Sequence, residues 1–496
     1  MNVKKRILFL TIIATSLIGL LSVSSPVRAG LLDASNVKLG GYYMAREIYF
    51  HNIELKNSEN TSYFYQRFRL EPQLNVNEDI VIKTQIDMLD DVLWGDNMDS
   101  GNSVYNGNPT NNSAYFPNSV TTSDGTGLLN INVKRVWLEY HSPVGDFSIG
   151  RMPYGFGLGV NYNDGDGFKN EWGDAYYGNT ADQIQFATMP MGKDGPLITV
   201  LNYAKMKSNG ISNPYDDDDW YTFIPGYTSK MATVLLLLQH QEQNLFKKNI
   251  NYAELYADIT PVDHLKLLVD YFYISGSLLP FTASSAAAQA MQSVLGTDKL
   301  KVVDAQGGVF RGTYNMSPLD YVLEIGFSPA NGNSSSDIET YPFSNDYNSS
   351  LILFNNTGLA APGGLLSLNN PTYASLNAAG SLNNTSIPPT SVLKNDFLYV
   401  APMVKFVPAD FLKAKLQLMY AETNDFVNYA GLLGRTAGKP ARDLGYEADF
   451  GVDTTLSDKF IFGFQTGYLI PGGVFKDATG KADGVFAFVT RFTVLF

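Results

Sequence analysis

Charged side chains recur two residues apart in several stretches of this sequence. Arg67 and Arg69 form one such pair, and Glu447 and Asp449 form another. In an extended strand, residues two apart point to the same face, so each pair would present two like charges side by side. Such an arrangement attracts ions of the opposite sign. It does not by itself catalyse a reaction, which needs an activated nucleophile or a positioned acid and base.

The sequence gives little support for catalysis. Its four histidines are His51, His141, His240 and His264, and no two of them have the spacing of metal ligands. There is no G-x-S-x-G motif, no phosphate-binding loop and no cysteine. We therefore predict that the protein is not an enzyme. A hydrolase at the rim of the fold is the alternative, and it would lose its activity when His51 is changed.

Strands with one apolar face and one polar face would hold these charges in place. Leu416 and Leu418 fall on one face of such a segment, and Lys415 and Gln417 fall on the other. Segments of about 8–14 residues repeat this pattern along the chain, separated by residues typical of turns. The C-terminal segment, 484–496, ends the chain in the same way, with phenylalanines on one face.

The connections between these segments alternate between short and long. Short turns carry Pro, Gly and Asp, and we place one of them at PGYTS, which begins at Pro225. The longest connection spans residues 329–392, and two roles stay open for it, a plug-like constriction and an outer flap. An alanine-rich stretch, Pro280–Gly296, is a candidate for a short helix.

Many long strands, no helices to cover them, and short turns opposite long loops are typical of an outer-membrane barrel. We predict an all-β fold, a transmembrane antiparallel β-barrel of about 18 strands (16–20) with short periplasmic turns and long extracellular loops. An even strand count brings both chain ends to the periplasmic side. Closure also leaves no sheet edge, so every backbone N–H and C=O can be bonded inside the protein, as lipid requires.

The first 29 residues have the pattern of a cleavable export signal. The cations of Lys4–Arg6 precede an apolar run, Ile7–Leu21, and Val27–Ala29 offers a small-residue cleavage site. An uncleaved anchor is the alternative, which the short apolar run disfavours. We expect residues 30–496 to form the barrel, in the outer membrane of a Gram-negative bacterium. Without the four cations of the signal, the net charge is −17, which argues against a nucleic-acid partner.

The polar faces of the strands would line the pore. An Arg or Lys on the lipid face near the midplane costs about 2–4 kcal/mol, so the charged face must turn toward water. The early strands supply mostly arginines, which predicts a basic wall opposite a more acidic one. The alternative is that these charges pair across strands and only stiffen the barrel. The predicted pore-lining residues are Arg46, Arg67, Arg69, Glu71, Lys83, Asp87, Arg135, Glu139, Arg151, Glu254, Asp258, Lys413, Lys415, Glu447, Asp449 and Arg491.

Four tyrosines share these polar faces: Tyr63, Tyr65, Tyr252 and Tyr256. A ladder of aromatic rings could follow a sugar along the pore. Tyrosine also fills the interior of barrels without any role in transport. The two interpretations stay open.

One loop is a candidate cation site. Asp164 and Asp166, in NYNDGDGFKNEWGD, supply hard oxygen ligands of the kind that calcium prefers, with Asn163 and Glu171 beside them. Their spacing does not match an EF-hand loop, and a glycine-rich acidic loop without metal is the alternative. We expect no other cofactor.

Two segments resemble outer-membrane porins. LGYEADFGVDTTLSDKFIFGFQTGYLIPGGVF, Leu444–Phe475, is similar to the closing strands of the alginate-export porin family, where a G-x-E-x-D strand, a short turn and a G-Y-x-x-P-G strand recur. GRMPYGFGLGVNYNDGDGF, Gly150–Phe168, resembles a segment of related porins. The resemblance implies an 18-stranded barrel with a basic, anion-selective pore. This chain departs from the family in its many lumen acids.

These patterns predict an outer-membrane porin for passive diffusion of small hydrophilic solutes, anions or saccharides among them. Its expected partners are these solutes, outer-membrane lipid and lipopolysaccharide, and the barrel-assembly machinery; the oligomeric state is not predicted. The alternative is a structural or interaction barrel whose loops or lumen engage a partner protein. Loops that fill the lumen and leave no continuous water path would favour that alternative.

Overall fold

The computed structural model describes the barrel strands, most turns and parts of the loops. The predicted export signal, residues 1–29, and the candidate helix, Pro280–Gly296, lie outside the described residues. Among the described residues, no helix is long and apolar enough to cross a membrane. The described residues are 36–53, 55, 60–93, 131–165, 170–173, 178–192, 194–207, 218–243, 247–278, 301–329, 337–338, 343–344, 346–355, 396–428, 436–457 and 459–496.

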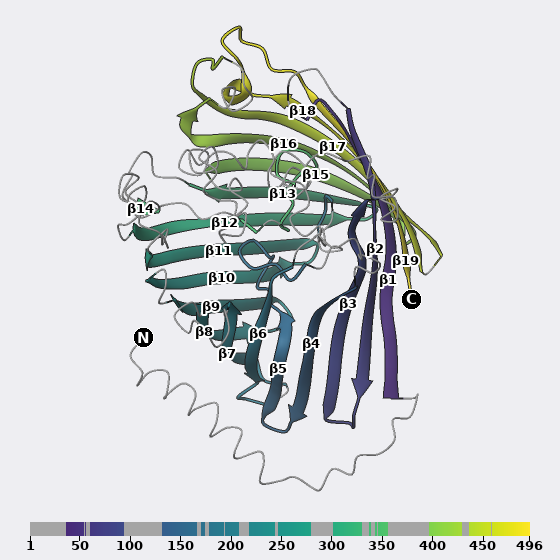
Figure 1. The fold of residues 1–496 in the computed structure, drawn as a ribbon, viewed down its shortest axis with the longest axis vertical. Helices are drawn as coiled ribbons and strands as arrows, with labels where there is room; N and C mark the ends of the chain where they lie inside the picture. Colours follow the sequence, from purple (N-terminus) through teal and green to yellow (C-terminus); the bar gives the residue numbers. More distant parts are fainter. Residues whose placement is uncertain are drawn as a thin grey trace, which may run out of the picture.

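The strands form one sheet that closes on itself (Figure 1). Each barrel strand pairs antiparallel with the next one along the chain, and the last pairs antiparallel with the first. Of nineteen strands, only the two-residue β14 (Asp337–Ile338) pairs in parallel, with β12, at a level that β13 does not reach. The other eighteen make the barrel, so the predicted antiparallel barrel of about 18 strands is confirmed.

The barrel strands are mostly nine to seventeen residues long, enough to cross a bilayer when tilted. Their bounds are β1 Val37–His51, β2 Asn60–Asn75, β3 Ile80–Leu93, β4 Ile131–Ser142, β5 Gly145–Pro153, β6 Thr180–Thr188, β7 Leu197–Lys207, β8 Asp218–Thr228, β9 Ala232–Gln243, β10 Lys248–Val262, β11 Leu265–Leu278, β12 Lys301–Met316, β13 Leu319–Ser328, β15 Phe397–Ala409, β16 Leu412–Val427, β17 Ala441–Ser457, β18 Phe460–Pro471 and β19 Val485–Leu495; a short 3₁₀ turn, η7, spans Gly473–Phe475.

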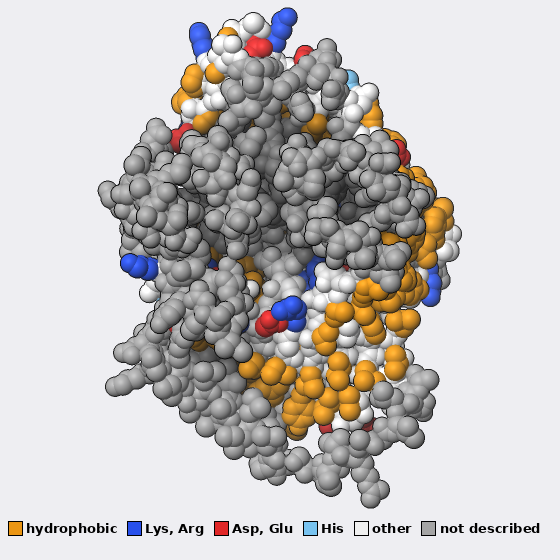
Figure 2. All heavy atoms as spheres, viewed as in Figure 1, with side chains coloured by type: hydrophobic (Ala, Val, Ile, Leu, Met, Phe, Trp, Pro, Cys, Tyr) orange, Lys and Arg blue, Asp and Glu red, His pale blue; other side chains and the backbone are white. Residues whose placement is uncertain are grey.

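The alternation of side chains gives the barrel an apolar outer surface. On β19, Phe486 and Phe492 are exposed, whereas Val485, Ala487 and Val489 are buried inside. Figure 2 shows apolar side chains gathered over the outer surface, at the lower right of the view. Apolar groups exposed on the outside of a closed sheet are stable in hydrocarbon, where the closed ladder leaves no backbone group unbonded.

Short turns lie at one end of the barrel and long connections at the other. Only residues 143–144 join β4 to β5, and only residues 317–318 join β12 to β13. The turn predicted at Pro225 is wrong, because β8 continues through it and turns at residues 229–231. The ladder between β8 and β9 skips Ile224 and Pro225, so the missing N–H of proline breaks no bond there.

Two loop segments enter the barrel and pack with the inward faces of the strands in its core. The first inserted segment comprises residues 154–165 and 170–173, between β5 and β6; the second comprises residues 343–344 and 346–355, between β13 and β15. Both carry buried apolar side chains, including Trp172 in the first and Phe354 in the second. For residues 329–392, the described part therefore has the plug-like role and not that of an outer flap.

Candidate functional site

Aromatic rings anchor the first inserted segment to one side of the barrel. The ring of Tyr154 lies 5.3 Å from Trp220 on β8, and the ring of Tyr162 lies 5.9 Å from Tyr252 on β10, measured between centroids. The Tyr154 hydroxyl also hydrogen-bonds with Gln239, and its burial raises the pKa of this hydroxyl. Tyr252 therefore holds the loop, and its ring is not free for a sugar.

Two carboxyl groups on the wall hold the tip of the same segment. The backbone N–H of Leu158 donates to Asp270 Oδ2 over 2.7 Å, and Asn161 Nδ2 donates to Glu254 Oε2 over 3.1 Å. Both acids are fully buried. A buried carboxylate is stable only where donors surround it, so these acids serve the loop and do not face open water.

A second pair of acids, on β17, holds the second inserted segment. Glu447 accepts the backbone N–H groups of Leu351, Ile352 and Leu353 over 3.0, 2.6 and 2.8 Å. Asp449 accepts the N–H of Leu351 over 3.3 Å. Successive N–H groups of a tight turn form a concave anion site, and here the wall supplies the anion.

The far end of the first segment is fixed by charge. Lys405 on β15 and Lys415 on β16 lie directly opposite each other, and both point inward. Glu171 lies between them: its carboxylate accepts from Lys405 and lies 3.9 Å from Lys415 Nζ. Burial alone would raise the pKa of Glu171, but the two lysine charges and the hydrogen bond from Lys405 outweigh it and lower that pKa to about 2.

Arginines dominate the wall where the barrel closes. Arg46 on β1 and Arg491 on β19 are directly opposite in register. On β2, Arg67 and Arg69 continue the same face, and both are buried. Arg69 donates two hydrogen bonds, of 2.6 and 2.7 Å, to the carboxylate of Asp87, which is a bidentate ion pair. Arg46 and Arg491, in contrast, are like charges placed opposite each other, and such charges repel.

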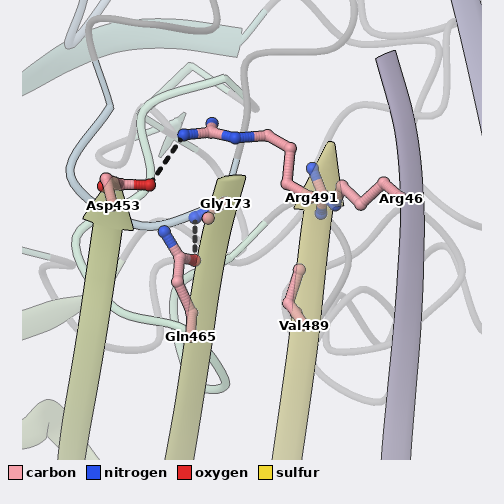
Figure 3. Close-up of a pocket in the computed structure, with 7 residues that line it drawn as sticks. Arg46, Gly173, Asp453, Gln465, Val489 and Arg491 are labelled. Atoms are coloured by element: carbon pink, nitrogen blue, oxygen red, sulfur yellow. Dashed lines mark hydrogen bonds and ion pairs between the residues drawn. The ribbon is translucent and has the colours of Figure 1, made fainter. Parts of the chain in front are cut away.

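A small cavity of about 10 Å³ lies between this wall and the first inserted segment (Figure 3). Arg46 and Arg491 line one side of it, and Gly173 of the inserted segment lines the other. The Gly173 N–H donates to Gln465 Oε1 over 3.0 Å, and Arg491 donates to Asp453 over 3.1 Å. Two arginines and one aspartate, Asp453, line the cavity, so its charged side chains carry a net positive charge.

The strand alternation places every predicted pore-lining residue except Arg151 on the inward face. Arg151 shares a face with Ile149, which is exposed on the outside, and it forms a bidentate pair with Asp182. The interpretation of Arg151 as pore-lining is therefore wrong. The strand register explains this orientation. Arg151 lies opposite Val136 on β4, whose side chain is also exposed on the outer face.

Several inward pairs join lumen residues to each other. Lys83 contacts Glu139 over 2.9 Å, and Lys266 contacts Asp258 over 3.0 Å. Glu71 accepts from Gln85 over 2.9 Å. These pairs match the alternative that part of the charge stiffens the wall.

Sequence reasoning missed one cation of this wall. Lys134 lies 3.7 Å from Asp87, on the same inward side as Arg135. The register between β3 and β4 shifts between Gln85 and Ile86, so two successive residues of β4 face inward. Strict alternation cannot reveal such a bulge.

The candidate calcium loop is only partly described. Asn163 Oδ1 accepts the N–H of Gly165, which is a turn within the loop. Glu171 is directed at the lysines, and Asp166 lies outside the described residues. In the described part of the chain, no group of three acidic or histidine side chains is placed to hold a metal. A calcium ion at Asp164 and Asp166 stays a prediction.

No protein-family model and no curated protein matches the chain. Solved structures of Pseudomonas aeruginosa outer-membrane proteins align along its whole length. OccK8 (OprE) aligns with a TM-score of 0.49 at 11% identity, over 94% of this chain and 100% of that one. OccK2 (OpdF) in complex with glucuronate gives 0.49 at 9% identity, over 95% and 100%. OpdK with vanillate gives 0.48 at 10% identity, over 94% and 100%. The fold assignment rests on the strand pairings of this chain itself.

A closed antiparallel barrel with an apolar exterior and a charged interior is built for the outer membrane of Gram-negative bacteria. The chain is an outer-membrane β-barrel of this kind. Its lumen carries an arginine-rich wall and two loops that acids of the wall hold in place.

Proposed function

We propose that this protein is a selective outer-membrane channel that passes small hydrophilic anions by passive diffusion. The observation that carries the proposal is the pair Arg46 and Arg491, opposite each other across the closing strands and beside a cavity. Two guanidinium groups in this arrangement are stabilised when an anion enters between them.

The distribution of charge favours anions along this wall. Arg67, Lys134 and Arg135 extend the positive face across β2 and β4. Walls of low dielectric concentrate the field of such a row and raise the local concentration of the opposite ion. The net charge of the whole chain does not oppose this, because selectivity depends on the charges that line the narrow part.

The lumen acids offer little to a passing cation. Glu254 and Asp270 bind one inserted segment, and Glu447 binds the other. Each of these carboxyl groups already accepts at least one hydrogen bond from an inserted segment, and all three are buried. A cation would have to displace a loop to reach them.

Small carboxylates are the solutes that we propose. A carboxylate matches the planar fork of an arginine with two parallel hydrogen bonds. The OccK2 structure contains glucuronate and the OpdK structure contains vanillate, and both of these ligands are carboxylates. Membership of the alginate-export type, saccharide transport, and lipid, lipopolysaccharide and assembly-machinery partners remain predictions from the sequence.

Planar-bilayer recording tests the proposal. Under a salt gradient, the reversal potential of the wild type should show anion preference. Replacing Arg46→Gln together with Arg491→Gln should shift this potential toward cations, whereas Arg151→Gln, which removes one cation from the outer face, should leave it unchanged. A cation-selective wild type, or an equal shift in both variants, would reject the proposal.

The inserted segments also support a second candidate, the structural barrel. Among the described residues, both segments contribute side chains to the core inside the barrel, as that alternative expects. Conductance separates the two candidates. A folded, purified barrel that conducts at no voltage would favour the structural barrel.

A further inference from the structure

Lys405 and Lys415 form an anion site in the barrel wall. They lie directly opposite on neighbouring antiparallel strands, and both turn inward. Like charges in this position destabilise a sheet unless an anion lies between them. The wall therefore carries a site for a carboxylate that does not depend on the inserted loop.

The occupant of this site is a residue of the protein. The Glu171 carboxylate bonds to Lys405, and Lys415 donates to the Glu171 backbone oxygen. The Lys415 ammonium also lies 4.6 Å from the centre of the Trp172 ring. Glu171 thus fixes the end of the inserted segment to two strands, with its carboxylate at Lys405 and its backbone oxygen at Lys415.

The site is reachable from water. The Glu171 side chain keeps 27% of its surface exposed, and the Lys405 side chain keeps 26%. Water therefore reaches Glu171 and Lys405, whereas the Lys415 side chain is only 10% exposed. The buried acids on β10 and β17 differ in this respect, because they are fully enclosed.

Movement of Glu171 would change the cavity beside the arginine wall. Trp172 Nε1 donates to Gln417 over 2.9 Å, and the next residue, Gly173, lines the cavity beside Arg46 and Arg491. Only one residue lies between Glu171 and Gly173. Release of the carboxylate would remove the ion pair that holds this end of the segment to the wall, and the cavity would widen as the bonds of Trp172 to Gln417 and of Gly173 to Gln465 then break.

We propose that Glu171 is an internal mimic of the transported solute, and that a small carboxylate opens the channel by replacing Glu171 at Lys405 and Lys415. The proposal rests on the proposed function, since it assigns to the channel a site that its solute class would bind. Binding and opening are then coupled, because the solute can bind only as the inserted segment leaves. The site lies on β15 and β16, apart from the arginine wall.

Single-channel recording with acetate as the probe tests this coupling. At constant ionic strength, replacing chloride by acetate should raise the open fraction of the wild type, and neutral acetamide should not. A Glu171→Gln variant should show a high open fraction without acetate, about tenfold above the wild type, since a hydrogen bond between charged groups is lost. It should respond no further to acetate.

Three further variants complete the test. Glu171→Asp, which keeps the charge on a shorter chain, should lie between the wild type and Glu171→Gln. The double variant Lys405→Gln/Lys415→Gln should also lose the acetate response. Glu139→Gln removes a lumen carboxylate that pairs with Lys83 and contacts neither lysine of the site, so it should behave as the wild type.

The outcome separates the two proposals. If the wild type conducts with anion preference but acetate leaves its open fraction unchanged, the internal-mimic proposal is overturned and the channel stands. The same holds if Glu171→Gln and Glu139→Gln behave alike. If no variant conducts, the proposed function fails together with the coupling.

Discussion

Replacing Glu447→Gln should loosen the second inserted segment without releasing it. The wild-type carboxylate accepts three backbone N–H groups, from Leu351, Ile352 and Leu353. An amide of the same shape has one oxygen, so at least one donor loses its acceptor and faces an NH₂ group. A hydrogen bond to a charged group contributes about 1.5–3 kcal/mol, which corresponds to a factor of about 10–150 in the docking equilibrium.

Apolar packing keeps the second inserted segment docked in most molecules of the Glu447→Gln variant. Leu351, Ile352, Leu353 and Phe354 are all buried, at 0–2% exposure. Burying one such side chain contributes about 1.5–3 kcal/mol, so four contribute several times the loss at Glu447. The variant should therefore keep the mean conductance of the wild type and open this segment more often.

A cysteine reporter measures that opening, and the cysteine-free chain provides a clean background. Ser349→Cys places a thiol on the buried segment, at 6% exposure. A membrane-impermeant maleimide should label it about 10–150 times faster in the Glu447→Gln background than in the parent. Glu139→Gln is the matched control and should leave the rate unchanged. An unchanged rate in both would mean that apolar packing alone holds the segment, and our account of Glu447 would be wrong.

Three other results are expected. Phe354→Ala removes a ring that lies 4.8 Å from the ring of Phe397, and deleting a buried Phe costs about 3–5 kcal/mol. This change should therefore speed the labelling of Ser349→Cys more than Glu447→Gln does. The pKa of Glu171 is lowered to about 2. Its ion pair is therefore fully formed above the ordinary glutamate pKa of about 4.3 and weakens only as the pH falls toward 2. The open fraction without carboxylate solutes should stay constant between about pH 5 and 8. Phe496→Ala removes the ring 5.7 Å from Phe68 on the outer face and should change heat stability, measured as the unfolding temperature in detergent, without changing ion selectivity.

The sequence was sufficient for the strands because hydrocarbon and water impose opposite demands on alternate residues. Leu416 and Leu418 could face only lipid, and Lys415 and Gln417 could face only the lumen. The same rule failed at Arg151, whose outward position is tolerated because Asp182 pairs with it and both keep more than half of their side-chain surface exposed. A single charge near the rim does not carry the penalty of one at the midplane.

The loops could not be predicted in the same way. Glu171 was a candidate calcium ligand because its neighbours in sequence are acidic and glycine-rich. Its partners, Lys405 and Lys415, lie more than 230 residues away, and no local pattern connects them. One feature of the sequence could have indicated this contact. Lys405 and Lys415 lie on consecutive strands, and two inward lysines opposite each other need an anion between them. Such a sign requires the strand register, which periodicity alone does not fix.

The anion selectivity that we propose for this acidic chain rests on two like-charge pairs. Lys405 faces Lys415, and Arg46 faces Arg491, each across a pair of neighbouring strands. The first pair is neutralised by Glu171, and the second borders a cavity. Most inward acids bind backbone N–H groups or cations of the wall, so their charge is already compensated inside the protein. The arginines keep a positive field beside this cavity even though Arg491 pairs with Asp453, and Glu171, whose side chain is 27% exposed, is the group that we propose a carboxylate solute replaces.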